Sequence, residues 1–454
     1  MALESLNPAT GELLETFEEW SDTQVAETVD QVNHAWTAWR KTSFADRSTL
    51  MKRAAEVLRE HAESYARTMA LEMGKPISEG RAEINKCAAC CDFYADHAAS
   101  FLADEVIASD ASKSYVAHRP LGVVLAVMPW NFPFWQVFRF AAPALMAGNT
   151  GLLKHSSNVP RCALQIEEVF EKAGFPKNVF RTLMIGSRKV DAVIEHPHVK
   201  AVTLTGSDIA GRKVAAKAGE MLKKTVMELG GSDPFVVLAD ADLDEAAAVA
   251  AKARCLNSGQ SCIAAKRFIV VEEVYDLFLE KFTAQMAALV VGDPLDEKSQ
   301  VGAQARDDLM QELHEQVEAS VAKGAKVVLG GQPLERQGSF YPPTILTEVV
   351  PGMPAYHEEF FGPVALVIRA KDADDALRIA NDTPFGLGAS VWTADNTQGE
   401  RFALQMEAGA AFVNGMVKSD PRLPFGGVKI SGFGRELSYH GIKEFVNIQT
   451  VWMK

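Results

Sequence analysis

Residues 201–211 read AVTLTGSDIAG, an apolar run followed by a glycine-containing turn and then a helical pattern. This sequence predicts a buried strand over 201–205 and a helix beyond Gly211. Upstream, strand and helix signals alternate along the chain at 150–154, 161–173, 179–184 and 189–195. The alternation predicts an α/β fold with a parallel sheet, whose ligands bind at the carboxyl ends of the strands.

The pattern continues in both directions from this stretch. Residues 21–73 predict long amphipathic helices, and residues 112–119 alternate before the apolar run 122–128, as in a hairpin that leads into a buried strand. We expect the chain to change lobe near Gly230 and Gly231, because a second alternating series follows them. Its strand signals lie at 234–238, 267–271, 326–329, 364–368 and 411–414.

The composition indicates a globular protein with more than one lobe. The chain has 454 residues, 48% of them hydrophobic and 23% charged, and its length exceeds that of a single small core. A net charge of −13 disfavours binding to nucleic acid or to an anionic membrane. No apolar stretch approaches the roughly 20 residues that cross a bilayer, and nothing resembles a signal peptide. Six cysteines are too few for a disulfide scaffold, so we expect a cytoplasmic protein.

Two short motifs indicate covalent chemistry. ELGG at 228–231 places a carboxylate before two glycines, and NSGQSC at 257–262 places a thiol after a Gly-Gln turn. A thiolate attacks carbonyl carbon, and a carboxylate activates the water that hydrolyses a thioester, so the pair suggests catalysis on an aldehyde. A lone cysteine is usually an inert buried residue and a lone glutamate is usually solvated. Together, however, the motifs favour Cys262 as nucleophile and Glu228 as base.

Other candidate residues depend on their context. Asn131 lies in PWNFP between two prolines, which suits a fixed oxyanion donor but also an ordinary turn. Gly206 and Ser207 lie between a strand and a helix, as a dinucleotide phosphate site does, although the spacing is not GxGxxG. Lys154 follows a strand and is either a ribose ligand or a surface lysine. The cysteines near 87–91 resemble half a metal site; without a second His/Cys pair a packed helix face is the better interpretation, and we expect no metal.

Seven motifs occur in the order typical of the aldehyde dehydrogenase superfamily, which the chain resembles over nearly its whole length. They are PWNFP at 129–133, Lys-x-Ser at 154–156, TGS at 205–207, ELGG at 228–231, NSGQSC at 257–262, EEFFGP at 358–363 and PFGGxKxSGxGRE at 424–436.

The resemblance implies a three-part α/β architecture: a Rossmann-type NAD(P)-binding domain over 1–101 and 121–230, an α/β catalytic domain over 231–436, and a β oligomerisation element. That element comprises a hairpin at 102–120 and the strand-like tail 437–454, whose pairing would form homodimers or homotetramers. From the residues alone, the tail is either a strand that pairs with another subunit or an ordinary edge strand.

The family's site residues can be carried over position by position. Cys262 matches the nucleophile, Glu228 the base and Asn131 the oxyanion donor. The cofactor-binding positions match Trp130, Lys154, Gly206, Ser207, Glu359 and Phe361.

The implied reaction is oxidation of an aldehyde to a carboxylate through a thiohemiacetal and a thioester on Cys262, with hydride transfer to nicotinamide and hydrolysis assisted by Glu228. Relatives that transfer the acyl group to coenzyme A generally lack this glutamate and are disfavoured. A thiol hydrolase without a redox step and a catalytically silent binding protein are the alternative classes.

Arg139 interrupts an apolar run and requires an anionic partner if it is buried. From spacing alone, a carboxylate of the protein is the favoured partner. Succinate-semialdehyde dehydrogenases, however, resemble this chain in an arginine at that position and in a serine at Ser419. We therefore expect a short aldehyde with a terminal carboxylate that Arg139 and Ser419 bind. Succinate semialdehyde is the first candidate, and glutarate semialdehyde or a broader range are the alternatives. A second arginine of those enzymes is missing here: Leu256 fills its place, and Arg254 and Lys418 lie nearby in sequence.

The cofactor is NAD or NADP. Relatives restricted to NAD often have a glutamate three residues after the ribose-binding lysine, where it repels a 2′-phosphate. Ser157 occupies this position, so NADP should be tolerated.

Overall fold

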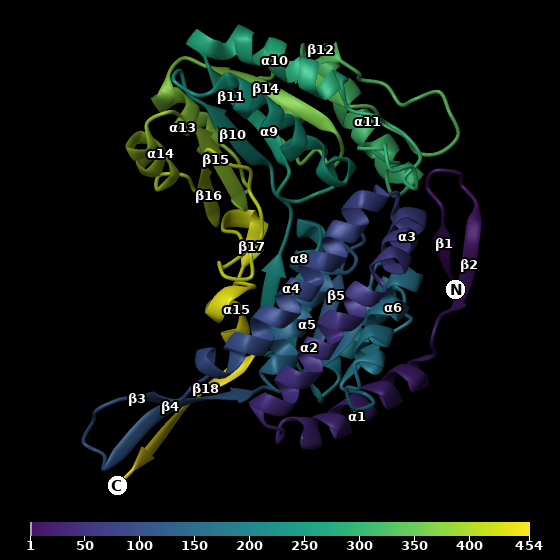
Figure 1. Cartoon of the computed structure of the whole chain (residues 1–454), viewed down its shortest axis with the longest axis vertical. Coiled ribbons are helices and arrows are strands. Elements are labelled where there is room, and N and C mark those ends of the chain that lie inside the picture. Colours follow the sequence, from purple (N-terminus) through teal and green to yellow (C-terminus); the bar gives the residue numbers. More distant parts are fainter. Residues whose placement is uncertain (1) are drawn as a thin grey trace.

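The computed structural model describes residues 2–454, which form two large sheets flanked by helices (Figure 1). The first sheet has the order β17-β9-β8-β5-β6-β7. Its strands are β5 (Val123–Met128), β6 (Thr150–His155), β7 (Phe180–Thr182), β8 (Val199–Thr205), β9 (Lys224–Glu228) and β17 (Gly432–Phe433). Its helices are α1 (Asp22–Trp39), α2 (Phe44–Glu60), α3 (Ala62–Met73), α4 (Ile77–Phe101), α5 (Trp135–Met146), α6 (Pro160–Lys172), α7 (Val190–Glu195) and α8 (Asp208–Glu220).

The second sheet has the order β12-β13-β14-β11-β10-β15-β16. Its strands are β10 (Asp233–Val237), β11 (Ala265–Val271), β12 (Lys326–Leu329), β13 (Thr344–Thr347), β14 (Val364–Ala370), β15 (Gly388–Trp392) and β16 (Ala410–Val413). The later helices are α9 (Leu243–Cys255), α10 (Tyr275–Ala287), α11 (Asp307–Ala322), α12 (Pro354–His357), α13 (Ala373–Asn381), α14 (Asn396–Ala403) and α15 (Ser438–Lys443). No helix among residues 2–454 is long and apolar enough to span a bilayer.

Burial on both faces explains the continuous apolar run of β5. Side chains of a strand alternate between its two faces, and in β5 both sets are buried. Val124 and Ala126 belong to the core shared with α2, α4, α5 and α6, whereas Val123 and Leu125 belong to the core shared with α1, α7 and α8. The expected parallel sheet is thus confirmed, with helices on both faces.

The connection order of this sheet positions a ligand site. The strands β5 to β9, counted from first to fifth, lie in the order 3-2-1-4-5 and are parallel, which is the Rossmann arrangement. The order reverses between β5 and β8. The segments after these two strands contain Trp130, Asn131, Gly206 and Ser207, at the carboxyl edge where the fold binds ligands.

Several expected boundaries differ from those observed. The helix expected beyond Gly211 begins at Asp208, because Ser207 caps it by accepting a hydrogen bond from the backbone N–H of Ala210 at 3.3 Å. Gly211 is therefore inside α8, where a Cβ atom would approach Leu229 Cδ2 to 2.5 Å, so the glycine permits close packing of the helix on the sheet. The strand expected at 179–184 is only three residues long, and the short strands β13 and β15 were not predicted.

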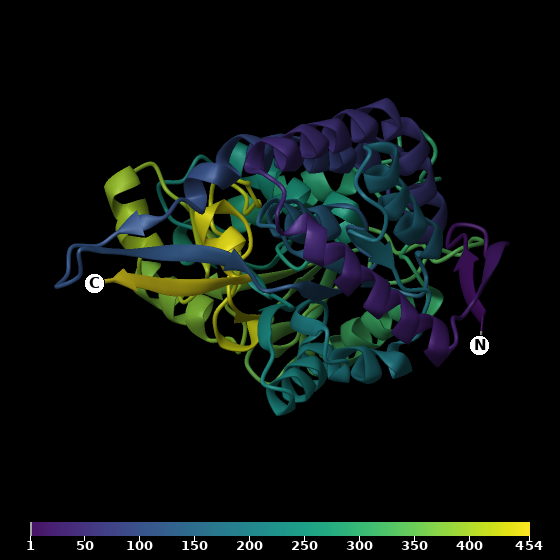
Figure 2. The same cartoon turned by 90° about the horizontal axis from the view of Figure 1, so that it is seen from below.

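The C-terminal strand finds its partner within the chain. β18 (Val446–Met453) pairs antiparallel with β4 (Lys113–Pro120), which also pairs with β3 (Glu105–Val106). Figures 1 and 2 show β4 and β18 side by side, extending away from the body of the protein. The hairpin expected to lead directly into the next buried strand is a separate sheet, and β18 is its edge strand. A hairpin at the other end, β1 (Ala2–Leu6) with β2 (Leu13–Glu18), completes the strands.

A short antiparallel pairing connects the end of the chain to the first sheet. Gly432 of β17 lies opposite Glu228 of β9, although the segment 231–436 otherwise follows the second sheet. Gly432 has φ +116, and a Cβ atom there would overlap the carbonyl oxygen of Met227. Only glycine therefore permits β17 to lie against the strand that ends at Glu228.

Replacing Gly432 with alanine should lower the free energy of unfolding by at least about 2 kcal/mol, because the new Cβ both clashes and strains the backbone. Gly219→Ala is the matched control. Its Cβ meets nothing within 4 Å in α8, so its stability should change by less than about 1 kcal/mol. Urea denaturation of both variants measures the difference; equal stabilities would contradict the assigned role of Gly432.

Candidate active site

Cys262 lies where two cavities meet. The larger cavity, about 270 Å³, is lined by Trp130, Asn131, Gly206, Ser207, Cys262, Glu359 and Phe361, among others. The smaller cavity, about 90 Å³, is lined by Arg139, Cys262 and Ser419, among others. Seven of the residues expected at the active site thus line the larger cavity, two others line the smaller one, and Cys262 is part of both walls.

The loop before the nucleophile has an unusual backbone. Asn257 and Ser258 have φ values of 55° and 56°, which side-chain-bearing residues rarely adopt, and Gly259 follows with φ 76°. A Cβ atom at Gly259 would overlap the backbone of Gly362. Such strain persists only where surrounding contacts hold it, and it is concentrated at functional sites.

Three loop residues hold this conformation through contacts with other segments. The contacts join Asn257 Nδ2 to the carbonyl of Asn131 at 2.7 Å, Ser258 Oγ to the N–H of Gly302 at 2.8 Å, and Gln260 Oε1 to the N–H of Ala305 at 2.9 Å. These buried amide and hydroxyl groups explain why the motif consists of Asn, Ser and Gln: each satisfies a backbone group that would otherwise be buried without a partner.

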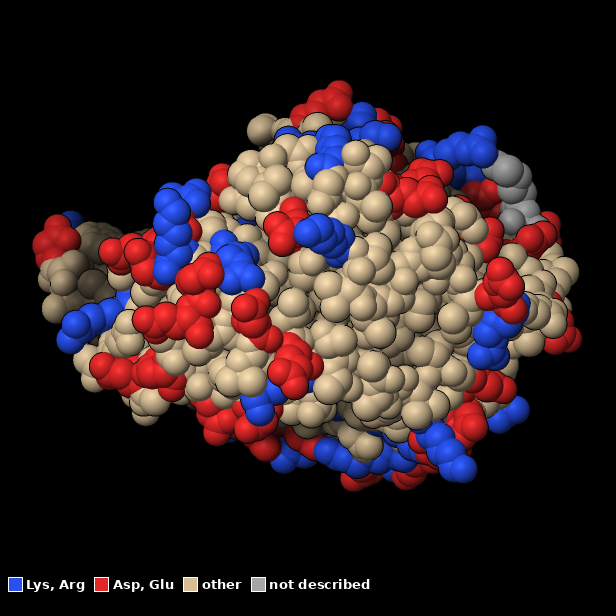
Figure 3. Space-filling view, turned by 90° about the horizontal axis from the view of Figure 1, so that it is seen from above, with Lys and Arg blue, Asp and Glu red and all other residues tan. Residues whose placement is uncertain are grey.

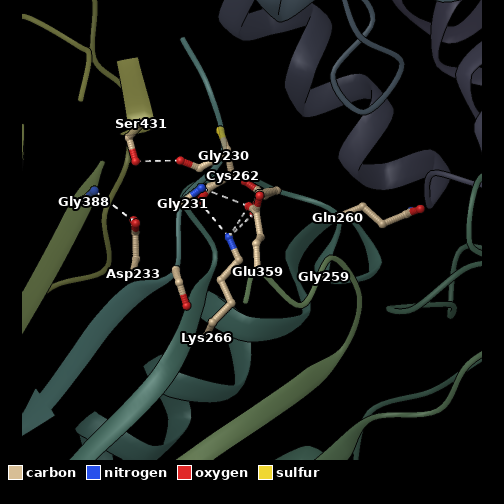
Figure 4. Close-up of polar contacts among 12 residues, drawn as sticks. Gly230, Gly231, Asp233, Gly259, Gln260, Cys262, Lys266, Glu359, Gly388 and Ser431 are labelled. Atoms are coloured by element: carbon tan, nitrogen blue, oxygen red, sulfur yellow. Dashed lines mark hydrogen bonds and ion pairs between the residues drawn. The ribbon is translucent and has the colours of Figure 1, made fainter. Parts of the chain in front are cut away.

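Lys266, which follows Cys262 in sequence, holds the end of the same loop (Figure 4). Its Nζ donates to the carbonyl oxygens of Ser261 at 2.8 Å and Cys262 at 2.7 Å, and pairs with Glu359 Oε1 at 3.1 Å. The same carboxylate oxygen accepts the N–H of Gly231 at 3.1 Å. One buried ammonium group therefore joins the nucleophile loop to an acid that lines the larger cavity.

The Cys262 thiol is protonated at rest. Burial raises the pKa of the thiol to about 12, against the positive charges of Lys266 and Arg139, which lower it. Attack on a carbonyl therefore requires removal of the proton during the reaction, or a further cation beside the sulfur.

Asn131 is held rigidly with a donor to spare. Its Nδ2 donates one hydrogen to the carbonyl of Gln260 at 3.0 Å, and its Oδ1 accepts from Gln136 Nε2 at 3.0 Å. The second Nδ2 hydrogen and the backbone N–H of Cys262 have no acceptor among residues 2–454. Because Asn131 and Cys262 line the same cavity, this pair can stabilise an oxyanion there.

The PWNFP segment is anchored by a buried acid. Glu83 Oε1 accepts the N–H groups of Phe134 and Trp135, both at 2.9 Å, at the start of α5. Lys75 pairs with Glu83, and its Nζ lies 3.9 Å from the ring centroid of Phe132. The segment is therefore fixed from α4 and from the turn before it.

Glu228 lies at the end of β9, behind the cavity wall. It is 2% exposed, and neither carboxylate oxygen has a hydrogen-bond partner among the described residues. Burial, together with the nearby Glu436 carboxylate, raises the pKa of Glu228 well above its usual range. Its neighbours Leu229 and Gly230 line the larger cavity, whereas Glu228 lines neither cavity.

Arg139 has a partner within the protein. Its guanidinium forms a buried ion pair with Glu436, donates to Thr205 Oγ1 at 3.3 Å, and lies 4.5 Å from the ring centroid of Phe425. Glu436 is thus the carboxylate of the protein that the sequence favoured as the partner of Arg139. Arg139 also lines the smaller cavity, so its charge faces that space as well.

The larger cavity has features suited to a nicotinamide dinucleotide. Trp130 and Phe361 meet edge to face, with centroids 5.7 Å apart, and supply a flat apolar wall. Gly206 lines the cavity just before the first turn of α8, where backbone N–H groups favour phosphate oxygens. Glu359 presents a carboxylate suited to ribose hydroxyls. These donors and surfaces fit the cofactor that the sequence predicts.

Two expected cofactor residues lie outside the lining of the larger cavity. Lys154 is 6% exposed in β6, and burial lowers the pKa of its ammonium group. Ser157 is exposed in the turn that follows, and Ser156 Oγ donates to Asn158 Oδ1 in the same turn. No acidic side chain occurs in residues 154–158.

Two lysines were missed by sequence reasoning. Lys266 and Lys86 belong to none of the motifs, and no spacing rule singles out a lysine whose partners are distant in sequence.

Arg254 and Lys418 lie near the place of the missing second arginine. Arg254 is fully buried and donates to the carbonyl of Gly259 at 2.6 Å, so it supports the loop. Lys418 is exposed at the wall of the smaller cavity.

The thiol, the two free amide donors and the aromatic-lined cavity beside them fit the site expected of a cysteine-dependent aldehyde oxidoreductase. The family model described as "Aldehyde dehydrogenase family" matches residues 1–451, and the chain belongs to this family. It is 52% identical over 453 residues to a "Probable succinate-semialdehyde dehydrogenase (NADP+)" of Synechocystis, and 51% identical over 456 residues to "Succinate-semialdehyde dehydrogenase (NADP+) 1" of Mycobacterium tuberculosis. Each alignment covers 100% of both chains.

Solved structures agree with this assignment. A structure of Gox0499 superposes with a TM-score of 0.98 at 40% identity, and succinic semialdehyde dehydrogenase from Streptococcus pyogenes, in complex with NADP+, superposes with 0.98 at 36% identity. Both comparisons cover 100% of each chain. The aldehyde dehydrogenase fold expected from the motifs is therefore confirmed.

Asn131→Ala should lower kcat for aldehyde oxidation by about 10²–10³-fold, because it removes one of two oxyanion donors. Asn85→Ala is the control, since this exposed amide contacts only its own helix, and should keep kcat within about twofold. Steady-state kinetics with circular dichroism as a check on folding measures both. An Asn131→Ala enzyme with unchanged kcat would remove this amide from the oxyanion site.

Proposed function

We propose that this aldehyde dehydrogenase oxidises succinate semialdehyde to succinate, with NADP+ as the oxidant. The supporting observation is the position of Cys262 in the walls of both cavities, one sized for a nicotinamide nucleotide and the other small and lined by cations without an acid. The names of relatives about half identical over the whole chain support the same substrate and cofactor.

The first step is attack by Cys262 sulfur on the aldehyde carbon in the smaller cavity. As the carbon–sulfur bond forms, the carbon–oxygen π bond breaks and the thiol proton passes to a water molecule in the cavity, so the carbonyl oxygen becomes an oxyanion. Asn131 Nδ2 and the backbone N–H of Cys262 donate to this oxygen. Lys266 keeps the loop in place by donating to the carbonyl groups of Ser261 and Cys262, the first of which shares a peptide unit with the Cys262 N–H.

Oxidation and hydrolysis complete the cycle. NADP+ held by the residues of the larger cavity would accept the hydride that leaves the thiohemiacetal carbon, which would leave a thioester on Cys262. Water then attacks the thioester carbon, Glu228 takes the proton of that water, and the acid product leaves as the Cys262 sulfur is released. Because Glu228 lies behind the cavity wall, its side chain must rotate toward the sulfur for this step. The high pKa of Glu228 makes it a strong base once it is ionised.

The smaller cavity favours a short acidic aldehyde. Its walls include Arg139, which Glu436 partly neutralises, and Ser419. A volume of about 90 Å³ suits a short aldehyde. A glutarate-semialdehyde-type or broader dehydrogenase remains the second candidate, whereas a thiol hydrolase without redox chemistry would leave the larger cavity without a role.

The face drawn in Figure 3 carries no large cluster of Lys and Arg of the kind that binds nucleic acid. Lys and Arg lie there singly or in small groups among more Asp and Glu, as the net charge of −13 suggests. We therefore propose a small-molecule enzyme without a nucleic-acid or membrane partner.

We also propose the predicted domain division and a homodimer or homotetramer. The outer edge of β18 pairs with no other strand among residues 2–454, and this strand carries exposed Ile448 and Trp452, which supports pairing with a second subunit. Sedimentation velocity gives the mass, and a monomer would contradict this proposal.

We also propose a cytoplasmic location, because Cys262 must remain a free thiol and all six cysteines are unpaired.

The wild-type enzyme should prefer succinate semialdehyde to butanal, which has four carbons and no carboxylate, by at least about 100-fold in kcat/KM. Absorbance of the reduced nucleotide measures both rates with NADP+ and with NAD+. Equal kcat/KM values for the two aldehydes would reject the proposed substrate class.

Ser157→Glu should lower kcat/KM for NADP+ by about 10–100-fold and leave NAD+ within about threefold, because the new carboxylate repels a 2′-phosphate. Ser157→Ala is the control and should change neither value by more than about threefold. A Ser157→Glu enzyme equally impaired with both nucleotides would show that position 157 does not face the 2′ group.

A further inference from the structure

One cation in the wall of the smaller cavity is not assigned to any role above. Lys86, on α4, is half-buried; its Nζ donates to Ser419 Oγ at 2.7 Å and lies 4.2 Å from the ring centroid of Trp135. No acidic side chain of residues 2–454 forms an ion pair with Lys86. Its charge thus faces the cavity without a counter-charge from the protein.

The other cations of this cavity differ from Lys86. Arg139 is paired with Glu436, and Lys418 is exposed to solvent. No aspartate or glutamate of the described part of the chain lines the cavity. Lys86 is therefore the enclosed cation best able to gain from an anionic ligand.

The burial of the Lys86 ammonium group also favours an anionic ligand in the cavity. Burial, together with the neighbouring Arg139 charge, lowers the pKa of Lys86 to about 8, and nearby Glu83 opposes the shift. The ammonium group is still mostly protonated at pH 7, but it is less stable than in water. A carboxylate in the cavity would compensate the burial of this charge.

The hydroxyl of Ser419 is oriented to donate to an anionic ligand in the same cavity. Its hydroxyl oxygen accepts hydrogen bonds from Lys86 Nζ and from Trp135 Nε1 at 3.0 Å. A hydroxyl has one hydrogen to donate, and that hydrogen has no acceptor among the described residues. It is therefore available for an anionic oxygen in the cavity.

We propose that Lys86, acting with Ser419, binds the carboxylate of the acidic aldehyde and determines the preference of the enzyme for it. This inference rests on the proposed function. Lys86 thereby supplies from α4 the second positive charge that the sequence lacks at Leu256. Since Lys86, Ser419 and Cys262 all line one cavity of about 90 Å³, a single short ligand can reach the cation and the nucleophile together.

The test compares Lys86→Met, which keeps the length of the side chain and removes its charge, with Lys86→Arg, which restores a charge. Lys172→Met, on the surface of α6 and outside both cavities, is the control for loss of one lysine. For Lys86→Met we expect KM for succinate semialdehyde to rise about 10–100-fold, with kcat within about threefold. For butanal, kcat/KM should stay within about threefold, and Lys86→Arg should recover most of the loss for the acidic aldehyde.

Product inhibition supplies a readout that does not depend on turnover. The inhibition constant of succinate should rise in Lys86→Met by a factor similar to that of KM, and remain unchanged in Lys172→Met. If Lys86→Met does not fold, Lys86→Gln replaces it in the same measurements.

Three results have distinct meanings. An unchanged KM for succinate semialdehyde in Lys86→Met would overturn the inference, as would an equal loss of kcat/KM for both aldehydes, which indicates a structural role. If the wild-type enzyme itself does not discriminate the two aldehydes, the proposed function fails, and the inference fails with it. A wild-type preference that survives Lys86→Met overturns the inference alone.

Discussion

The site depends on one buried cation, Lys266, and on the oxygens that surround it. Its three N–H donors meet two carbonyl groups of the nucleophile loop and the carboxylate of Glu359, so the loop and the cofactor side of the site share one anchor. A buried ammonium group is stable only with such a complete set of partners. Burial in turn lowers the pKa of Lys266 and raises that of Cys262, so the resting site is protonated at sulfur and its reactivity must develop when ligands bind.

Backbone strain complements this anchor. The left-handed residues 257–259 turn the chain sharply between α9 and β11, and their amide and hydroxyl groups are held by segments from both lobes. These contacts fix the loop in a position where Cys262 forms part of two cavity walls. In the proposed reaction one cavity would hold the hydride acceptor and the other the aldehyde, so the geometry of a single loop would couple the two ligands.

The fold and much of the site followed from the sequence because they rest on local signals. Apolar runs that end in short polar motifs predicted the parallel strands and placed Trp130, Gly206 and Ser207 at their carboxyl ends. Contacts distant in sequence could not be predicted from local signals, because the pairing of Arg139 with Glu436 and the buried orientation of Glu228 both depend on packing. The resemblance alone indicated that the C-terminal strand belongs with the hairpin at 102–120. Lys86 and Lys266 were missed for the same reason, since a lysine has no local signature of its role.

In the proposed reaction Cys262 becomes acylated during turnover and Glu228 releases the product. The Glu228→Gln enzyme, mixed with succinate semialdehyde and NADP+, quenched rapidly with acid and analysed by peptide mass spectrometry, tests both steps. A succinyl thioester is expected on the peptide that contains Cys262, and only when the oxidised nucleotide is present. Formation of reduced nucleotide without any adduct on that peptide, or an adduct on another cysteine, would contradict the proposed reaction.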